Sequence, residues 1–150
     1  MLRLSKLTDY GIVLITEMAT EPKRVFSATE LALVTSLEQP TVSKVLKILA
    51  KSGLIQSYRG AHGGYLIVGQ PQHISVADVI TAMEGPIGIT ECSVHKGLCA
   101  QEAVCALRSN WRRISSAIEM ALADVTLEEM TRPMTPPINV REMRLNSRIA

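Results

Sequence analysis

The hydrophobic period of the chain changes abruptly between residues 39 and 68, and this change constrains the fold most. The first part, "QPTVSKVLKILAKSG", has an early proline, a final glycine and apolar residues at helical spacing, which are Val42, Val45, Leu46 and Leu49. Two β-prone runs follow, residues 54–58 and 65–68, joined by a glycine-rich turn. A helix with one apolar stripe must bury that stripe, so we expect other helices to pack against it and a hairpin to lie beside it.

Two further helices are predicted before this segment. The stretch "TDYGIVLITEMAT" places Ile12, Ile15, Met18 and Ala19 on one broad apolar face. In "SATELALV", Ser27 is followed three residues later by Glu30, which has the form of a capping box and marks the start of a second helix. Three helices and a hairpin predict a mainly α fold with a small β-hairpin wing, a winged helix-turn-helix domain over residues 1–70.

The face of the third helix opposite its apolar stripe is polar and basic. In a helix-turn-helix, such a face enters the major groove of double-stranded DNA. The residues that we expect to reach base edges are Gln39, Thr41, Ser43 and Lys44. Those that we expect to meet phosphates or the minor groove are Lys47, Lys51, Arg59 and His62. The alternative is a solvated surface helix, beside a hairpin whose glycines serve only its turn.

Charge is distributed unevenly along the chain. The formal net charge is only +2, which does not by itself indicate a nucleic-acid partner. Residues 1–64, however, carry eight Lys and Arg against five Asp and Glu, whereas residues 65–130 carry four against eight. This asymmetry predicts that two tasks are divided along the chain. Because no apolar run approaches the length of a membrane span and the start is no secretory signal, we expect a cytoplasmic protein without a membrane partner.

Residues 71–130 are predicted to form a connecting helix, a cysteine loop and a dimerisation helix. Ser75 and Asp78 mark the start of the connecting helix. A long helix from about Glu102 carries an apolar seam, which consists of Leu107, Trp111, Ile114, Ile118 and Val125. The seam suits pairing with a second copy in a homodimer, although this helix could instead pack on its own N-terminal domain. Residues 131–150, with four arginines and one glutamate, are typical of a disordered basic tail.

All three cysteines of the chain, Cys92, Cys99 and Cys105, lie in the stretch "ECSVHKGLCAQEAVC". In a reducing compartment, an odd and clustered set favours metal or redox chemistry over structural disulfides. Six and five residues separate the cysteines, more than the two to four that zinc sites use, and a longer loop suits an iron–sulfur cluster. Zinc with His95 as a ligand, a bare thiol switch and inert buried thiols remain alternatives.

Several segments together resemble the IscR-like family of bacterial winged-helix regulators. They are "LSKLTDYGIVLITEMA", "ELALVTSLEQPTVSKVLKILAKSGLI", the wing "RGAHGGYLIV" and "ISVADVITAMEG", and the resemblance extends from about Leu4 to Met130. Within the family, "ECSVHKGLC" and "NWRRI" look most like the regulator of the Suf cluster-assembly operon. The resemblance implies a dimeric transcription factor, usually a repressor, that binds an imperfect palindrome in a promoter and senses through a [2Fe–2S] or [4Fe–4S] cluster on the three cysteines.

The resemblance leaves the fourth ligand of the cluster open. Where the iron–sulfur-assembly branch has a histidine, this chain has Arg108, whose protonated guanidinium cannot bind iron. The nitric-oxide-sensing branch instead uses an aspartate in a "TDYG" motif of the partner subunit, and the equivalent residue here is Asp9. Our hypothesis is that Asp9 of one protomer completes the site of its partner. A capping or surface carboxylate is the alternative for Asp9, and the reserve ligands are His95, Glu91 and Glu102.

Other functions fit the sequence less well. A ferredoxin-like electron carrier would leave the winged-helix half without a purpose. An enzyme is not expected, because the chain has no nucleophile motif, phosphate loop or paired carboxylates. The second hypothesis is a nitric-oxide or thiol-redox sensor of the same architecture. In the cluster-sensing regulator, we expect the cluster-bound and cluster-free forms to differ in affinity for the operator.

Overall fold

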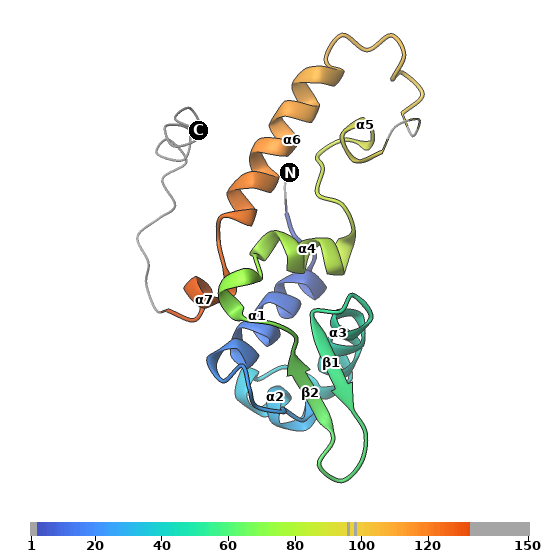
Figure 1. Ribbon diagram of the computed structural model, residues 1–150. Helices are drawn as coiled ribbons and strands as arrows, with labels where there is room; N and C mark the ends of the chain where they lie inside the picture. Colours follow the sequence, from blue (N-terminus) through green and yellow to red (C-terminus); the bar gives the residue numbers. More distant parts are fainter. Residues whose placement is uncertain (1–2, 96, 98, 133–150) are drawn as a thin grey trace.

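The computed structural model describes residues 3–95, 97 and 99–132, and begins with three helices and a hairpin (Figure 1). The helices are α1 (Lys6–Thr20), α2 (Ala28–Thr35) and α3 (Gln39–Lys51). The hairpin pairs β1 (Ile55–Tyr58) with β2 (Gly64–Ile67) in antiparallel register, with Ile55 opposite Ile67. The predicted mainly α fold with a small β-hairpin wing is therefore confirmed.

The second half of the chain is helical. A short 3₁₀ turn at Pro71–His73 leads into α4 (Val76–Glu84), and a linker then reaches α5 (Glu91–Val94). The longer α6 (Arg108–Ala123) and the short α7 (Leu127–Met130) complete the described residues. Among these residues, no helix is long and apolar enough to cross a membrane. Most of the predicted basic tail lies outside the described residues.

Side-chain caps explain where several of these helices begin. Ser75 and Asp78 form the complete capping box that the sequence predicts, with the Ser75 hydroxyl accepting from the Asp78 amide and the carboxylate accepting in return. At α2 only half of the predicted box forms. The Ser27 hydroxyl accepts from the Glu30 amide at 3.1 Å, but the Glu30 carboxylate binds the Arg24 guanidinium instead.

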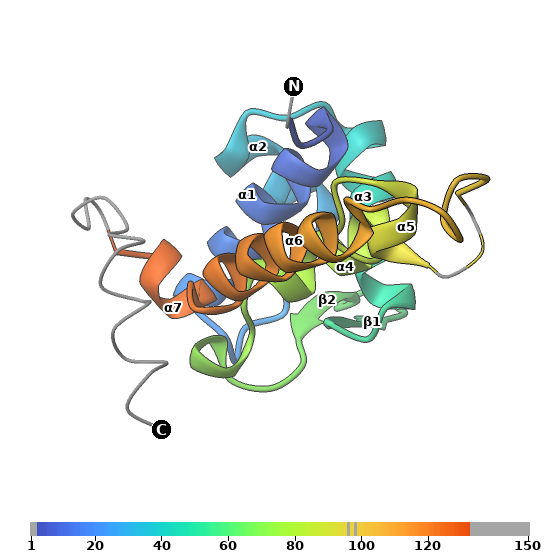
Figure 2. The same ribbon diagram turned by 90° about the horizontal axis from the view of Figure 1, so that it is seen from above.

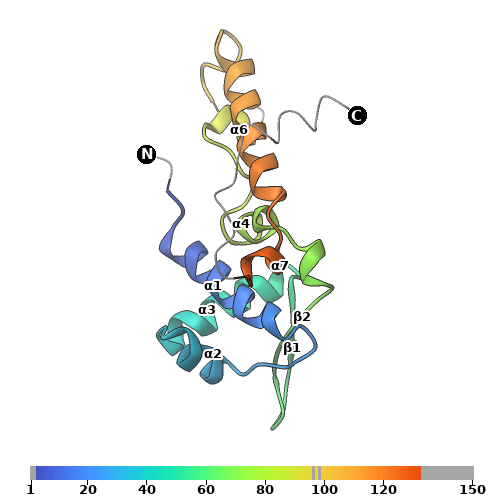
Figure 3. The ribbon, with the colours of Figure 1, turned by 90° about the vertical axis from the view of Figure 1, so that its left-hand side faces the viewer.

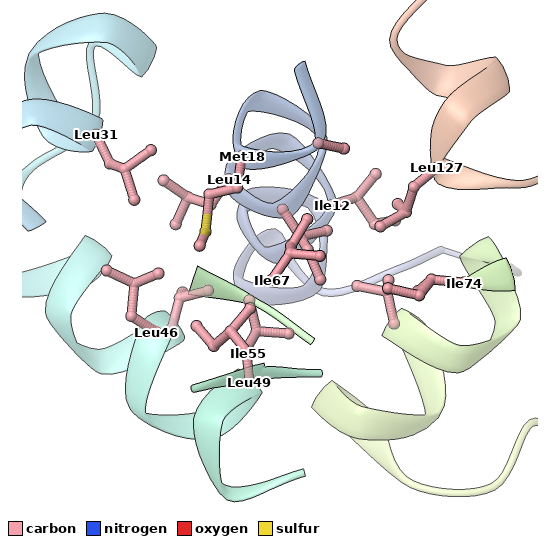
Figure 4. Close-up of a cluster of buried hydrophobic side chains, with 14 of the residues drawn as sticks. Ile12, Leu14, Met18, Leu31, Leu46, Leu49, Ile55, Ile67, Ile74 and Leu127 are labelled. Carbon is pink, nitrogen blue, oxygen red and sulfur yellow. The ribbon is translucent and has the colours of Figure 1, made fainter. Parts of the chain in front are cut away.

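The hydrophobic core lies around α1, which packs against α2, α3, α4 and α7. Figure 4 shows Leu14 and Met18 of α1 facing Leu46 of α3, with Leu127 of α7 on another side. The face of α1 predicted from sequence, which is Ile12, Ile15, Met18 and Ala19, is buried as expected. Each Leu, Ile or Met that is fully buried contributes about 1.5–3 kcal/mol, so this cluster is the main source of stability.

The end of α6 is joined to the start of α4 by backbone hydrogen bonds. The Val76 amide donates to the Val125 carbonyl, and the Leu127 amide donates to the Ile74 carbonyl, each at 2.8 Å. Val125 lies after the end of α6 and packs against the core. Its assignment to the apolar seam of a dimerisation helix was therefore wrong, because α6 ends two residues earlier.

α6 extends away from the body of the molecule (Figures 1 and 3). Seen from above, α6 passes over α4, with α1 and α2 on one side and the hairpin on the other (Figure 2). The helix begins at Arg108 and not near Glu102, so the predicted start was six residues too early. The reason is that the Glu102 carboxylate accepts from the Gly97 amide and binds Arg108, which closes the preceding residues into turns.

Candidate nucleic-acid interface and cysteine loop

α3 is divided into a buried and a solvent-facing side. Its predicted stripe, which is Val42, Val45, Leu46 and Leu49, is fully buried. Lys44, Lys47 and Lys51 are exposed, and Thr41 and Ser43 are half-buried next to them. Because the stripe anchors the helix, the basic residues face outward together, as insertion into a groove requires.

The amino end of α3 contacts α2 through a pair of polar side chains. Gln39 is the first residue of α3 and is exposed, and its amide nitrogen donates to the Thr29 hydroxyl at 2.9 Å. Thr29 was not among the residues predicted from sequence. Its one signal is a hydroxyl in the first turn of α2, which does not reveal a partner ten residues away.

The loop between β1 and β2 carries the two predicted wing residues. Arg59 and His62 are both exposed, and Gly60 adopts a positive φ of 109°. The base of the wing is attached to the helical body by a β-bridge between Phe26 and Tyr65, with backbone hydrogen bonds of 2.9 and 2.8 Å. The wing is therefore a fixed extension of the domain.

Two glycines of the wing are required by its own packing. A Cβ atom on Gly63 would collide with the Tyr58 carbonyl oxygen, and one on Gly64 would collide with the Phe26 carbonyl oxygen. Close approach to a sugar–phosphate chain would be another reason for glycine in a DNA-binding wing. The structure supplies a sufficient reason within the protein, because neither position has room for a side chain.

The three cysteines lie on different local structures. Cys92 is in α5 and is 8% exposed, and its sulfur lies 3.3 Å from the Thr90 hydroxyl. Cys99 and Cys105 are half-buried in the turns that lead to α6, and all three thiols are free. α5 packs against α6, and the Ile89 amide donates to the buried Ser115 hydroxyl of α6 at 3.2 Å. The start of the cysteine segment is thereby attached to α6.

Arg108 and Glu102 form an ion pair within the cysteine segment. The Glu102 side chain is only 11% exposed and that of Arg108 is 32% exposed, so solvent screens this pair less than a pair on the open surface. The Arg108 Nε atom is buried without a hydrogen-bond partner. A charged donor with one unused N–H group therefore lies three residues after Cys105, next to a segment that contains three thiols.

Asp9 is in the first turn of α1, and its side chain is exposed. The cap of this helix is Ser5, whose hydroxyl accepts from the Thr8 amide at 3.2 Å, so Asp9 is not the capping residue. Glu84 at the end of α4 fixes the same turn. Its carboxylate accepts from the Thr8 hydroxyl at 2.5 Å and from the Ser5 amide at 2.9 Å.

The side chains of the cysteine segment have the chemistry that an iron–sulfur cluster requires. In the described residues, however, a single chain does not bring enough of them close together to form a complete site. Three free thiols with an unused cationic donor nearby are the groups that bind and stabilise such a cluster. Among residues 3–95, 97 and 99–132, however, no three His, Cys, Asp or Glu side chains are grouped closely enough to hold a metal ion. Asp9, Glu91, His95 and Glu102 are thus not assembled with the cysteines of their own chain.

The three helices, the attached wing and the projecting α6 define a winged-helix protein of the class that regulates transcription. Residues 4–133 match the Rrf2 family, described as iron-dependent transcriptional regulators, and the chain belongs to that family. The resemblance to IscR-like regulators is thereby confirmed at the level of the family. A special closeness to Suf regulators stays a prediction.

Solved and sequenced relatives agree with this assignment. The structure is similar to that of CymR, the global cysteine regulator of B. subtilis, with a TM-score of 0.71 and 29% identity over 90% of this chain and 100% of that one. T. potens IscR has a TM-score of 0.66 and 26% identity over 90% and 93%. The HTH-type transcriptional regulator NsrR of Halalkalibacterium halodurans is 27% identical over 86% of this chain and 90% of that protein. The matched relatives are transcriptional regulators and not enzymes.

We predict that Glu84→Gln destabilises the protein at neutral pH. The hydrogen bond from the Thr8 hydroxyl, followed by that from the Ser5 amide, lowers the pKa of Glu84 below its ordinary value of 4.5. Stabilisation by the carboxylate is therefore present above the unfolded-state pKa and is lost as the pH falls through the lower folded-state pKa. We expect a loss of about 0.5 kcal/mol, because the carboxylate is largely exposed to solvent.

Urea unfolding of the wild type and of Glu84→Gln over a pH series will measure this difference. It should be largest near neutrality and disappear in acid. Glu119→Gln, which removes an exposed carboxylate from α6, controls for the change of net charge. A difference that does not vary with pH would contradict the role assigned to the ionised carboxylate.

Proposed function

We propose that this protein is a DNA-binding repressor of iron–sulfur cluster assembly (Suf) genes that senses through a cluster on Cys92, Cys99 and Cys105. The observation that carries the DNA-binding part is the outward basic face of α3, anchored by a fully buried stripe and flanked by a fixed wing with an exposed arginine. A helix for the major groove and an arginine beside it form the usual footprint of a winged helix on duplex DNA.

Pairing of two copies through α6 is part of the proposal. Leu107 is 55% exposed and Ile114 is 42% exposed, and Trp111 between them is half-buried. Only Ser115 of α6 is buried within a single chain. A projecting helix with a row of uncovered apolar side chains favours a symmetric partner, and two-fold symmetry matches a palindromic operator.

The cysteine segment would hold the cluster, with Asp9 of the partner subunit as the fourth ligand. When bound, a cluster supplies a link between segments that oxidation or loss of iron can break. The Arg108 Nε–H group would donate a hydrogen bond toward thiolate or sulfide. The family description as iron-dependent regulators, the free thiols and the absence of a ligand histidine at residue 108 support this assignment.

The described contacts provide a route from the cysteine segment to the DNA-binding face. Ile89 and α5 are attached to α6, and the end of α6 is bonded through Val125 and Leu127 to the residues that start α4. α4 packs against α1 and α3. A change at the cysteines can therefore shift the separation of two recognition helices in a dimer, provided that two arrangements exist with different affinity for the cluster.

A second candidate is a repressor that senses nitric oxide or thiol oxidation. The similarity to NsrR and the equivalence of Asp9 to the aspartate of the nitric-oxide-sensing branch favour it. Both candidates share the fold, the DNA and the cysteines. They differ in the trigger and in the target genes, which promoter mapping in cells will identify.

Anaerobically purified protein should contain iron and acid-labile sulfide, and each of Cys92→Ser, Cys99→Ser and Cys105→Ser should lose most of both. The reason is that thiolates are the donors on which iron–sulfur sites rely. Metal analysis and optical and Mössbauer spectra will measure the content and the cluster type. His95→Ala is the matched control for zinc-type ligation and should retain the cluster. Colourless wild-type protein without iron and sulfide would refute sensing through a cluster and leave only a DNA binder.

The cluster-bound and cluster-free forms should bind promoter DNA with affinities that differ about fivefold or more, the lower range of coupling free energies between sites. Fluorescence anisotropy on one labelled promoter duplex, at one fixed salt concentration, will measure both affinities. A duplex of scrambled sequence controls for binding to phosphates alone. Equal affinities of the two forms for the promoter would contradict regulation through the cluster.

Asp9→Ala should shorten the lifetime of the bound cluster, because the hypothesis makes its carboxylate the fourth ligand. The loss of absorbance after exposure to a chelator will measure this lifetime. Asp124→Ala, which removes an exposed carboxylate at the end of α6, is the matched control. Mixed dimers that combine an Asp9→Ala chain with a Cys92→Ser chain will test ligation across subunits. Unchanged spectra, lifetime and iron content in Asp9→Ala would end the hypothesis.

A further inference from the structure

Gln39 and Thr29 form a polar contact between the two helices of the helix-turn-helix. The Gln39 amide nitrogen donates to the Thr29 hydroxyl at 2.9 Å, and both residues are exposed. Gln39 begins α3, and the first residues of a recognition helix are those that reach base edges in the major groove. The role of this contact rests on the proposed function, because it concerns which base this protein recognises.

The two helices that carry these residues are held firmly together. The turn between them has Ser36 in the left-handed conformation, and the Leu37 amide donates to the Ala32 carbonyl at 3.1 Å. Leu31, two residues after Thr29, and Val42, three residues after Gln39, are both fully buried. The contact thus joins two rigid elements, and a side chain held there has a defined direction.

A glutamine amide has two N–H donors and a carbonyl oxygen that can accept. The contact with Thr29 uses one N–H, so the second N–H and the carbonyl oxygen of Gln39 stay available to a ligand. One donor and one acceptor on a planar amide are the groups that pair with adenine in the major groove. The oxygen accepts from the N6 amino group, and the N–H donates to N7.

We propose that Thr29 is a positioning residue that holds the Gln39 amide in the orientation that recognises adenine in each half of the operator. Thr29 acts through Gln39 and needs no contact with a base. An unheld glutamine rotates about its terminal torsion and can exchange its donor and acceptor sides, which weakens the preference for one base. The hydrogen bond to Thr29 restricts this freedom, because it holds the amide nitrogen of Gln39 at one place.

The test begins with the full chain, prepared anaerobically, and a pool of random duplex DNA. Selection gives a preferred duplex, and anisotropy titrations then compare it with duplexes changed at one base pair. The variants are Gln39→Ala, Thr29→Val, Thr29→Ser and the double variant. Valine has nearly the shape of threonine without the hydroxyl, and serine retains the hydroxyl. Thermal unfolding of every variant shows whether the fold is intact, and both sites are exposed.

We expect Gln39→Ala to reduce the preference for adenine at one position of each half-site about tenfold, within the range for one bidentate base contact. Thr29→Val should reduce the preference at the same position, Thr29→Ser should restore most of it, and the double variant should be no worse than Gln39→Ala alone. Replacing that adenine by 7-deazaadenine should weaken the wild type and leave Gln39→Ala unaffected.

Two results would overturn the inference while the proposed function stands. One is a Gln39→Ala variant whose base preferences match those of the wild type. The other is a Thr29→Val variant that retains the full preference for adenine. A wild-type chain that binds selected and random duplexes equally would instead refute sequence-specific regulation itself, and the inference would fall with it.

Discussion

The burial of one side of α3 against α1 determines which residues of this protein can face DNA. Successive residues of a helix are separated by about 100° of rotation. A turn of α3 by one residue would therefore bring Leu46 or Leu49 toward solvent and would bury a lysine. Each such leucine contributes about 1.5–3 kcal/mol when it is buried, so only one orientation of α3 is compatible with a folded domain. The direction of the basic face is a consequence of the core.

A second constraint is the attachment of α6 at its middle and just beyond its C-terminal end. In its middle the Ser115 hydroxyl connects it to the linker before the cysteines, and just after its C-terminal end Val125 and Leu127 are bonded to the residues that begin α4. α6 also packs against α4 of its own chain, while Ile114 and Met120 stay exposed. In the proposed dimer, the contacts of α6 with α4 would connect the pairing surface to the DNA-binding half of each chain.

The parts of the fold that depend on local physics could be predicted from the sequence. The periodicity of α1 and α3, the capping box at Ser75 and the wing are set by neighbouring residues, and the structure contains them. The start of α6 could not be predicted, because Glu102 accepts from Gly97 and binds Arg108, and helical periodicity carries no sign of such contacts. For the same reason Val125 was assigned to the wrong surface.

The candidate site also combines features that neighbouring residues determine with features that depend on contacts between distant segments. The solvent-facing lysines of α3 are predictable from the apolar stripe on its opposite side, whereas the contact of Gln39 with Thr29 depends on how two helices cross. The grouping of the cysteines stays a prediction, because the remaining ligands are expected from a second chain and a cofactor. Neither is encoded in the spacing of residues along one chain.

The lack of space at Gly63 and Gly64 separates the wing into positions that tolerate change and positions that do not. Ala61 and His62 are exposed between β1 and β2 and can accept most side chains without disturbing the strands. Libraries intended to give this scaffold a new operator should therefore randomise those two residues and keep the glycine pair.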